Sequence, residues 1–426
     1  MYCGSCLRDN ALATELIARG HEVTLVPVYT PTRTDEDNIS RPDVLFGGIS
    51  VYLQQRSPLF RRLPRLIDRL WDSPWVIGAF AGRGVSADAR LLGDLTISTL
   101  DGERGVLKKE FDKLVEWLSD EPAPDVVNLP NSLLISLAAP IKRVLGRPVC
   151  VTLQGEELFL SELTAPYRAR AIEMIRQQVA DVDCFIAVSE YCERFMRTFL
   201  GIPRERIAVV PLGINMRGYE KRAVPATGPR KEFRVGYFAR VSPEKGLHVL
   251  ADAYVRFRQR IGSAHARLDV AGYLGPAHRG YLDEATAILS RAGLEREMTY
   301  HGEVTRDGKL TFLRDLDVLS VPATYDEPKG MSLLEAMAAG VPCVQPRRGA
   351  FTEVIEKTGG GVLVEPDNPE ALASGLHALW SDRAYQMRLS NAAYDGVRAH
   401  YTIAHSVARQ IDVYDSVIGA ALSKGA

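Results

Sequence analysis

Residues 324–349 read TYDEPKGMSLLEAMAAGVPCVQPRRG, and this stretch decides the fold of the second half of the chain. The apolar run just before it, at residues 316–322, is typical of a buried strand. Residues 331–339 are rich in Leu, Met and Ala, which favours a helix, and Gly340 is placed to end it. A second apolar run follows. The pattern therefore predicts a strand, a loop, a helix and another strand in succession.

Two carboxylates lie on this stretch, Glu327 in the loop and Glu335 one turn into the helix. Between them, Gly330, Met331 and Ser332 would present free backbone amides at the helix start, which is a ready anion site. A loop acid, an anion cradle and a helix acid on the same side suit a particular kind of ligand. Such a ligand has a sugar at one end and phosphate in the middle.

A structural interpretation of the same residues stays open at this point. Ser332 and Glu335 have the spacing of a capping box, in which the glutamate only closes the start of its own helix. Glu327 would then be an ordinary loop acid. Short motifs have many chance matches, so the rest of the chain has to decide between the two interpretations.

Composition limits the class of protein. The chain has 426 residues, which suggests two or three domains, and 46% hydrophobic with 25% charged residues is typical of a soluble globular protein. A net charge of −1 offers no overall attraction to nucleic acid, and no apolar run reaches the ~18 residues that a membrane span needs. The six cysteines are scattered and no signal peptide is visible, so we expect a reduced, cytoplasmic protein.

Strand-like and helix-like patterns alternate strictly along the chain, which predicts parallel sheets with helices on both faces. A polar segment with Pro and Gly at residues 219–231 separates two such series. We therefore expect an α/β protein of two Rossmann-like, doubly wound domains that face a cleft. The first domain is placed at residues 1–217, the second at 218–404, and a final helix at 405–426 is expected to return to the first domain.

The start of the chain departs from this scheme. Residues 9–19 have helical spacing and residues 21–28 are typical of a strand. A doubly wound domain begins with a strand and a glycine turn before its first helix, and here Met1 falls inside that turn. We hypothesise that the first, central strand lies upstream of the stated start. A short amino terminus is the alternative.

Residues 59–75, from Leu59 to Trp75, carry a helical stripe of apolar side chains with arginines beside it. Two interpretations stay open. The stripe is either a basic amphipathic helix that rests on the inner face of a membrane or the buried face of an ordinary surface helix.

Two cations stand on the first strand-to-helix turn of the second domain, where doubly wound folds approach a pyrophosphate. Arg240 can bind two oxygens with its guanidinium group, and Lys245 supplies a point charge. Together with the amides at residues 330–332, they would neutralise a diphosphate. The alternative is that both are solvated turn residues.

Several segments, in order along nearly the whole chain, resemble one known family. They read RGHEVTLVPV, ADVDCFIAVSEYCERF, IAVVPLGIN, GYFARVSPEKG, DVAGYLG, YHGEV and EPKGMSLLEAMAAGVPCV. The last is similar to the E-x7-E signature of the retaining, nucleotide-sugar-dependent glycosyltransferases of family four, which have the GT-B fold. The resemblance implies that fold and a sugar-transfer reaction.

The resemblance also implies a role for individual residues. Arg240 and Lys245 hold the donor diphosphate, Glu327 contacts the hydroxyls of the donor sugar, and Glu335 accepts hydrogen bonds from the ribose. Further donor-binding residues lie on the nucleotide-side strands and in the remnant of a glycine-rich loop. These are Gly272, Gly302, Glu303, Val304 and Gly4.

One position departs from the family pattern. Family members commonly carry a histidine near the reacting sugar, and here that place holds Gln154. A carboxamide cannot carry a proton at neutral pH. In a retaining, front-face mechanism the leaving diphosphate can take the acceptor proton, so Gln154 stays a candidate for a positioning role in catalysis.

From these patterns we predict a glycosyltransferase that moves a hexose-type sugar from a nucleoside diphosphate sugar to an acceptor hydroxyl. The acceptor is expected to be a glycan or a lipid-linked molecule, with its contacts in residues 43–107. No metal and no further cofactor is expected, because D-x-D triplets occur at residues 35–37, 181–183 and 315–317, in unrelated contexts that indicate chance. A catalytically silent sugar-nucleotide-binding or scaffold protein is the alternative, as is a sugar-nucleotide epimerase.

Overall fold

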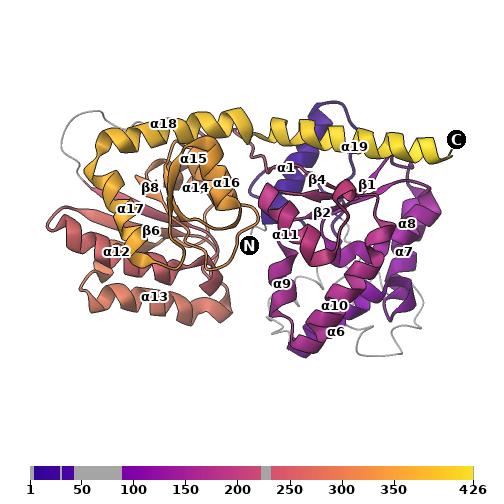
Figure 1. Ribbon diagram of the computed structural model, residues 1–426, viewed down its shortest axis with the longest axis horizontal. Coiled ribbons are helices and arrows are strands. Elements are labelled where there is room, and N and C mark those ends of the chain that lie inside the picture. Colours follow the sequence, from indigo (N-terminus) through magenta and orange to yellow (C-terminus); the bar gives the residue numbers. More distant parts are fainter. Residues whose placement is uncertain (1–3, 29–30, 43–88, 222–231, 426) are drawn as a thin grey trace. The chain divides into compact units, whose positions relative to one another are not determined.

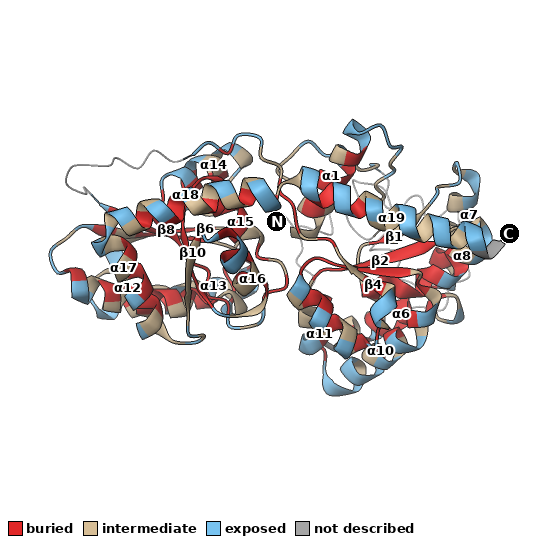
Figure 2. Ribbon diagram, turned by 45° about the horizontal axis from the view of Figure 1, so that its top comes forward, coloured by how far each residue is buried: buried red, intermediate tan, exposed pale blue. Residues whose placement is uncertain are grey.

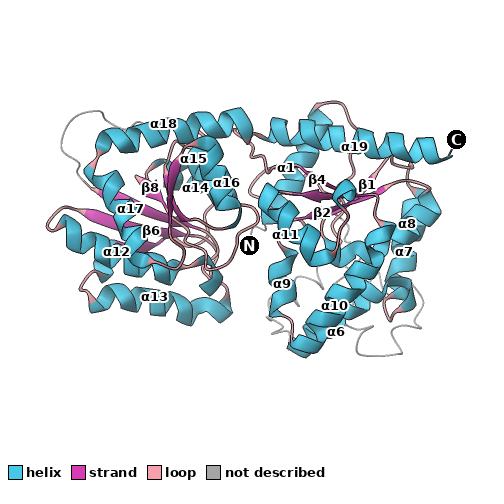
Figure 3. Cartoon of the chain, viewed as in Figure 1, coloured by secondary structure: helices cyan, strands magenta, loops and turns pink. Residues whose placement is uncertain are grey.

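The computed structural model describes residues 4–28, 31–42, 89–221 and 232–425. The chain divides into two compact units, which we describe separately. The six-stranded unit comprises Met1–Ala11 and Leu212–Ser406, and the four-stranded unit comprises Leu12–Pro211 and Val407–Ala426. In both units strands and helices alternate along the chain (Figures 1 and 3).

The strands of the six-stranded unit all run parallel, in the order β10-β9-β8-β5-β6-β7. They are β5 (Phe233–Phe238), β6 (Ala266–Ala271), β7 (Met298–Tyr300), β8 (Val318–Leu319), β9 (Cys343–Pro346) and β10 (Gly361–Val364). The strand order reverses at the direct pairing of β5 with β8. Such a reversal is a topological switch point, where the loops after two neighbouring strands diverge and leave room for a ligand.

Helices cover this sheet in two groups. On one side, α12 packs against α13 and α17, and on the other, α18 packs against α15 and α16 (Figures 1 and 2). Their bounds are α12 (Leu247–Ile261), α13 (Arg279–Arg291), α14 (Arg306–Arg314), α15 (Met331–Ala338), α16 (Gly349–Thr358), α17 (Pro369–Ser381) and α18 (Arg383–His400). Helix α1 (Gly4–Ala18) begins in this unit. The doubly wound arrangement predicted from the alternating pattern is confirmed.

The four-stranded unit has a parallel sheet in the order β1-β2-β3-β4. Its strands are β1 (Val127–Leu129), β2 (Val149–Leu153), β3 (Cys184–Ala187) and β4 (Ile207–Val209). Its helices are α6 (Ala89–Asp101), α7 (Lys108–Asp120), α8 (Ala138–Leu145), α9 (Glu156–Glu162), α10 (Ala165–Gln178) and α11 (Glu190–Leu200). Strand β2 is buried along its whole length, as an apolar central strand of a parallel sheet should be (Figure 2).

The last helix, α19 (Ile403–Gly425), packs on this sheet from Val407 onward. Val413 and Val417 contact a buried cluster that contains Cys184 of β3 and Val210 after β4. Apolar burial of this kind is worth about 25 cal/mol for each Å² removed from water. The end of the chain is therefore part of the core of the four-stranded unit.

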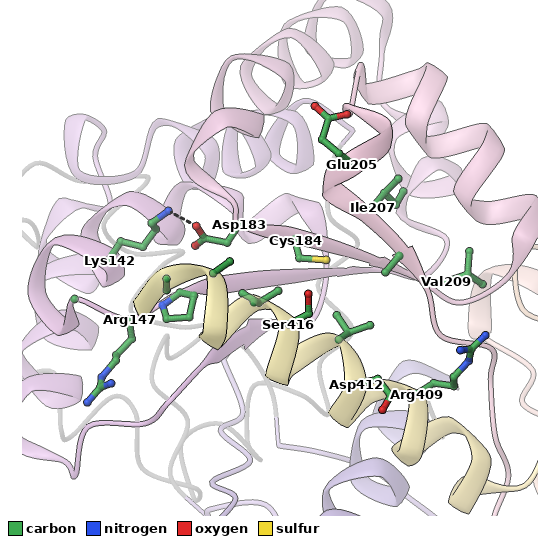
Figure 4. A pocket seen from close by; sticks show the side chains of 17 residues that line it. Lys142, Arg147, Asp183, Cys184, Glu205, Ile207, Val209, Arg409, Asp412 and Ser416 are labelled. Atoms are coloured by element: carbon green, nitrogen blue, oxygen red, sulfur yellow. Dashed lines mark hydrogen bonds and ion pairs between the residues drawn. The ribbon is translucent and has the colours of Figure 1, made fainter. Parts of the chain in front are cut away.

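A cavity of about 720 Å³ lies in the described part of the four-stranded unit, between α19 and the amino-terminal ends of β2, β3 and β4 (Figure 4). Its lining includes Pro148, Cys184 and Ile207 beside the three strand starts, and Lys142 pairs with Asp183 on its rim. Ligands of open parallel sheets bind at the carboxyl ends of the strands. This cavity is at the opposite end.

The structure corrects one predicted element and leaves another undescribed. Residues 21–28 form no strand, so the prediction of a strand there is wrong. A strand needs a ladder partner, and no described strand pairs with these residues. The segment 59–75 lies outside the described residues. Among the described helices, none is long and apolar enough to cross a membrane.

Candidate functional site

Two loops of the six-stranded unit meet at the switch point, one after β5 and one after β8. The amide of Thr324 donates to the carbonyl of Glu244 at 2.9 Å, so the loop backbones are joined directly. Gly246 makes this approach possible: its φ is +74°, and a Cβ there would lie 1.9 Å from the carbonyl oxygen of Pro322. A glycine is therefore required where the β5 loop passes the end of β8.

The side chains of Lys245 and Glu327 come together across these loops. Nζ of Lys245 donates to Oε2 of Glu327 at 2.5 Å and to the hydroxyl of Tyr325 at 2.6 Å. The Tyr325 hydroxyl in turn donates to the same oxygen, Oε2 of Glu327. Glu327 is buried and Lys245 half-buried. The loop acid and the turn cation that the sequence singled out separately thus form one hydrogen-bonded cluster.

This cluster fixes the charge of Glu327. Burial raises the pKa of the carboxyl, but the ammonium of Lys245 and the hydroxyl of Tyr325 more than offset that effect and hold the pKa at about 2. Glu327 is therefore an ionised carboxylate at neutral pH. It can accept hydrogen bonds, and it does not serve as a proton donor there.

The start of α16 contacts the backbone of Glu327 and holds it in place. The amide of Ala350 donates to the carbonyl of Glu327 at 2.8 Å. Gly349 has a φ of +53°, and a Cβ there would lie 2.4 Å from that same carbonyl oxygen. The glycine at the start of α16 thus lets this helix support the loop that carries the acid.

Arg240, the second predicted cation, is half-buried at the carboxyl end of β5. Its guanidinium donates to Oε1 of Glu244 at 2.5 Å, and the hydroxyl of Ser242 donates to the same oxygen at 2.6 Å. Burial raises the pKa of Glu244, but these donors hold it below its ordinary value. Each of the two predicted phosphate-binding cations therefore has a carboxylate partner in this structure.

Glu335 has partners that the sequence did not indicate. Lys309 of α14 donates to its Oε1 at 2.7 Å, and the Tyr219 hydroxyl donates to the same atom at 3.3 Å. All three residues are buried. No described residue donates to Oε2. Glu335 thus keeps one carboxylate oxygen for a ligand.

The capping-box interpretation of Ser332 and Glu335 is wrong. Helix α15 begins at Met331 with Gly330 as its N-cap, and no side chain caps it. Glu335 faces Lys309 instead of its own helix start. The first amides of α15, at Met331 and Ser332, have no partner within the helix, which is the arrangement that attracts an anion.

The predicted residues on the nucleotide-side strands lie at the same edge of the sheet. Gly272 follows β6 directly, and its amide donates to the carbonyl of Gly302 at 2.8 Å. Glu303 is exposed and Val304 half-buried in the loop after β7. Because these strands are parallel, their carboxyl ends place all four residues on the edge that carries Lys245.

Gly4 lies at the start of α1, which belongs to the six-stranded unit at this end. A Cβ at Gly4 would lie 4.0 Å from Nζ of Lys329, and that nitrogen donates to the hydroxyl of Ser5 at 2.9 Å. Lys329 sits between Glu327 and the start of α15. The predicted glycine is therefore close to the loop that carries the acid.

Gln154 belongs to the four-stranded unit and is buried where β2 ends. Its Nε2 donates to the carbonyl of Pro130 at 2.8 Å, and its backbone amide donates to Oε2 of Glu156 at 2.9 Å. Its Oε1 has no partner among the described residues. The carboxamide therefore donates to the protein and keeps an oxygen that can accept a hydrogen bond.

Sequence reasoning missed several members of the site. Tyr325 stands two positions before Glu327, and this closeness in sequence could have indicated a contact, but Tyr325 belongs to no known motif. Lys309 and Tyr219 lie far from Glu335 along the chain, and nothing in their local sequence connects them to it. Only the packing of α14 beside α15 brings Lys309 to the acid.

Comparisons with known proteins agree with this architecture. Two parallel-sheet α/β units and a loop site at a switch point define a GT-B glycosyltransferase fold. A crystal structure of HepE from Anabaena in complex with UDP has a TM-score of 0.62 at 17% identity, over 92% of this chain and 100% of that chain. Sucrose-phosphate synthase from Thermosynechococcus elongatus has a TM-score of 0.62 at 19% identity, over 74% of this chain and 79% of that chain. At these identities the likeness shows the fold alone.

Sequence comparison shows the family. Residues 221–396 match the model of glycosyl transferases group 1, and residues 10–213 match that of the glycosyl transferase 4-like domain. These two matches cover most of the chain, and the chain belongs to this glycosyltransferase family.

Two relatives give the range of similarity. The uncharacterized glycosyltransferase MJ1607 of Methanocaldococcus jannaschii is 23% identical over 68% of this chain and 75% of its own length. A phosphatidyl-myo-inositol mannosyltransferase of Mycobacterium tuberculosis is 30% identical over 55% of this chain and 60% of its own length. The match with the mannosyltransferase thus spans less than two thirds of that relative.

Proposed function

We propose that this chain transfers a hexose-type sugar from a nucleoside diphosphate sugar to an acceptor hydroxyl, with retention of anomeric configuration. The observation that carries the proposal is the cluster of Lys245, Tyr325 and Glu327 at the switch point of a doubly wound sheet. Family membership supports sugar transfer, and a likeness in fold to HepE, solved with UDP-glucose, supports a nucleotide-sugar donor.

In this proposal the donor diphosphate lies over the carboxyl ends of β5 and β8. Arg240 would bind two of its oxygens, Lys245 would supply a point charge, and the amides at the start of α15 would complete the cradle. The free Oε2 of Glu335 would accept from a ribose hydroxyl. These groups stabilise the negative charge that grows on the diphosphate as the sugar leaves.

The reaction breaks the bond between the anomeric carbon and the phosphate oxygen and forms a bond to the acceptor oxygen. The acceptor proton passes to the leaving phosphate oxygen, because Glu327, with a pKa of about 2, is too weak a base to keep that proton. The proposal needs no metal and no further cofactor, since Arg240 and Lys245 face the diphosphate. A chelator is expected to leave the rate unchanged.

The acceptor side of the proposal concerns the four-stranded unit. We propose a glycan or lipid-linked acceptor bound by the four-stranded unit, where the unpartnered Oε1 of Gln154 would accept from a hydroxyl group. The segment 43–88, which includes the helical stripe at 59–75, lies outside the described residues. A cytoplasmic location and contact with the inner membrane face stay predictions.

The first test is binding followed by turnover. Thermal unfolding is measured with UDP-glucose, UDP-N-acetylglucosamine and GDP-mannose, because a donor at 100 times its Kd stabilises the folded chain by about 2.7 kcal/mol. Transfer or hydrolysis of the stabilising donor is then followed, and the anomeric configuration of the product is determined by NMR. Binding without turnover would favour the silent sugar-nucleotide-binding alternative, and inversion would refute retention.

Lys245→Ala tests the site assignment. We expect kcat/KM to fall by roughly 10- to 100-fold, because a charge-assisted contact worth about 1.5–3 kcal/mol is lost. Lys357→Ala is a control, since Lys357, in the last turn of α16, also lies over a tyrosine ring, that of Tyr401, and belongs to the same unit. Near-normal transfer by Lys245→Ala would refute the assignment.

A further inference from the structure

The hydroxyl of Tyr325 contacts both charged groups of the cluster. It accepts a hydrogen bond from Nζ of Lys245 at 2.6 Å and donates one to Oε2 of Glu327. Nζ of Lys245 also lies 4.9 Å from the centroid of the Tyr325 ring. One uncharged group thus contacts the cation proposed for the diphosphate and the acid proposed for the sugar.

The two carboxylate oxygens of Glu327 are held unequally. Oε2 accepts from both Lys245 and Tyr325, whereas Oε1 accepts, among the described residues, only from the amide of Lys329 at 3.3 Å. That last bond is long, so Oε1 is the oxygen with more capacity left to accept from a ligand hydroxyl. The position of the whole carboxylate therefore depends on the partners of Oε2.

A bound diphosphate would change those partners. It carries more negative charge than one carboxylate, so it draws the ammonium of Lys245 away from Glu327. The phenol of Tyr325 has no charge and is not drawn in the same way. Once Lys245 has turned, Tyr325 is the described side chain that still donates to Glu327.

We infer that Tyr325 is a positioning residue, whose hydroxyl holds the Glu327 carboxylate against the donor sugar while Lys245 turns to the diphosphate. The inference rests on the proposed function, and it deepens it by separating two halves of the donor site. Lys245 serves the diphosphate half, and Tyr325, through Glu327, serves the sugar half. Loss of the Tyr325 hydroxyl should therefore affect only ligands that carry a sugar.

Tyr325→Phe removes the hydroxyl and keeps the ring. Dissociation constants are measured by calorimetry for UDP-glucose, GDP-mannose, UDP and GDP, together with kcat and KM for the donor that is consumed. We expect affinity for the nucleoside diphosphate to stay within about twofold. We expect kcat/KM for the nucleotide sugar to fall by about 10- to 100-fold, the effect of losing a hydrogen bond to a charged group.

Tyr254→Phe is a closely matched control in the same unit. The hydroxyl of Tyr254 donates to Oε2 of Glu297 at 2.7 Å, beside Arg258, which donates to that oxygen at 2.7 Å. Tyr254→Phe thus disrupts a similar arrangement of tyrosine, glutamate and cation that does not belong to the switch point. We expect this variant to leave the ratio of the dissociation constants for sugar-bearing and sugar-free ligands unchanged.

A double-mutant cycle shows whether Tyr325 acts through the acid. In the Glu327→Gln background, Tyr325→Phe should cause little further loss, because groups that act as a unit are not additive. Equal losses of affinity for UDP and UDP-glucose, or unimpaired transfer by Tyr325→Phe, would overturn the inference while the proposed function stands. A wild-type chain that binds none of the four ligands would overturn the proposed function, and the inference with it.

Discussion

Glu327 and Glu335 are both buried acids, and each is paired with a lysine. Lys245 is half-buried and reaches Glu327 from a loop, whereas Lys309 is buried and reaches Glu335 from a helix. A buried carboxylate without a cation would be costly, so each lysine offsets part of the cost of burying its acid. The half-buried lysine is the one that a ligand can engage.

The low pKa of Glu327 predicts how stability depends on pH. The ordinary value is 4.5 and the folded value about 2, so the folded chain binds fewer protons than the unfolded chain between these limits. The stabilisation is therefore fully present above pH 4.5 and is lost as pH falls toward 2. Between pH 6 and pH 3 this linkage amounts to about 2 kcal/mol.

Urea unfolding of the wild-type chain and of Glu327→Gln at a series of pH values measures this effect. We expect the stability advantage of the wild-type chain to narrow by about 2 kcal/mol between pH 6 and pH 3, since the variant lacks the titrating group. A constant difference between the two curves would mean that the Lys245 and Tyr325 contacts do not depress the pKa of Glu327.

Helix α16 positions the acid through its backbone. Its first residue, Gly349, lies against the Glu327 carbonyl, and Ala350 donates to that carbonyl. Its C-cap, Gly359, has a similar φ of +67°, but a Cβ there would meet only the methyl of Ala392, at 3.6 Å. Both ends of this helix thus need a residue with a positive φ. They differ in that only Gly349 lies against the backbone of Glu327.

Gly349→Ala and Gly359→Ala separate these effects. Both variants carry the cost of a left-handed residue, which is of order 1–3 kcal/mol, so both are expected to unfold at lower temperature. Only Gly349→Ala pushes on the Glu327 loop, so it alone is expected to weaken nucleotide-sugar binding, by more than tenfold. Thermal denaturation measures the unfolding temperature of each variant, and calorimetric titration of the folded variants measures nucleotide-sugar affinity. Equal affinity of the two variants would show that α16 does not position the acid.

Within the molecule as a whole, the end of the chain completes the core of the four-stranded unit. Val417 of α19 packs on the cluster around Cys184, while a Cβ at Gly419, two positions later, would lie in open space. A half-buried position and an exposed position of this helix are therefore close neighbours in sequence.

Val417→Asp is expected to destabilise the four-stranded unit by about 1–3 kcal/mol, because a charge replaces a half-buried apolar side chain that packs on the core. Hydrogen–deuterium exchange should rise in β2 and β3 and stay unchanged in β5 and β6. Gly419→Asp introduces the same charge without burial and should leave both sheets protected. Uniform exchange in both units after Val417→Asp would show that α19 does not act on this sheet alone.

Local pattern was enough to predict most of the fold. The helix at residues 331–339 forms as α15 within one residue of its predicted end, and the strand expected at 316–322 contains β8. Both are regular because apolar spacing reports which face of an element meets the core. The strand predicted at 21–28 failed because a strand also needs a partner, which its own residues cannot supply.

The sequence by itself determined the alternation of strands and helices, the family resemblance and the individual charges Arg240, Lys245, Glu327 and Glu335. Those are properties of short segments, so neighbouring residues encode them. Only the tertiary structure decided the partners: Tyr325 between Lys245 and Glu327, Lys309 on Glu335, and the carboxamide orientation of Gln154. The strand order joins loops that are distant in the chain, and no local pattern specifies which side chains then meet.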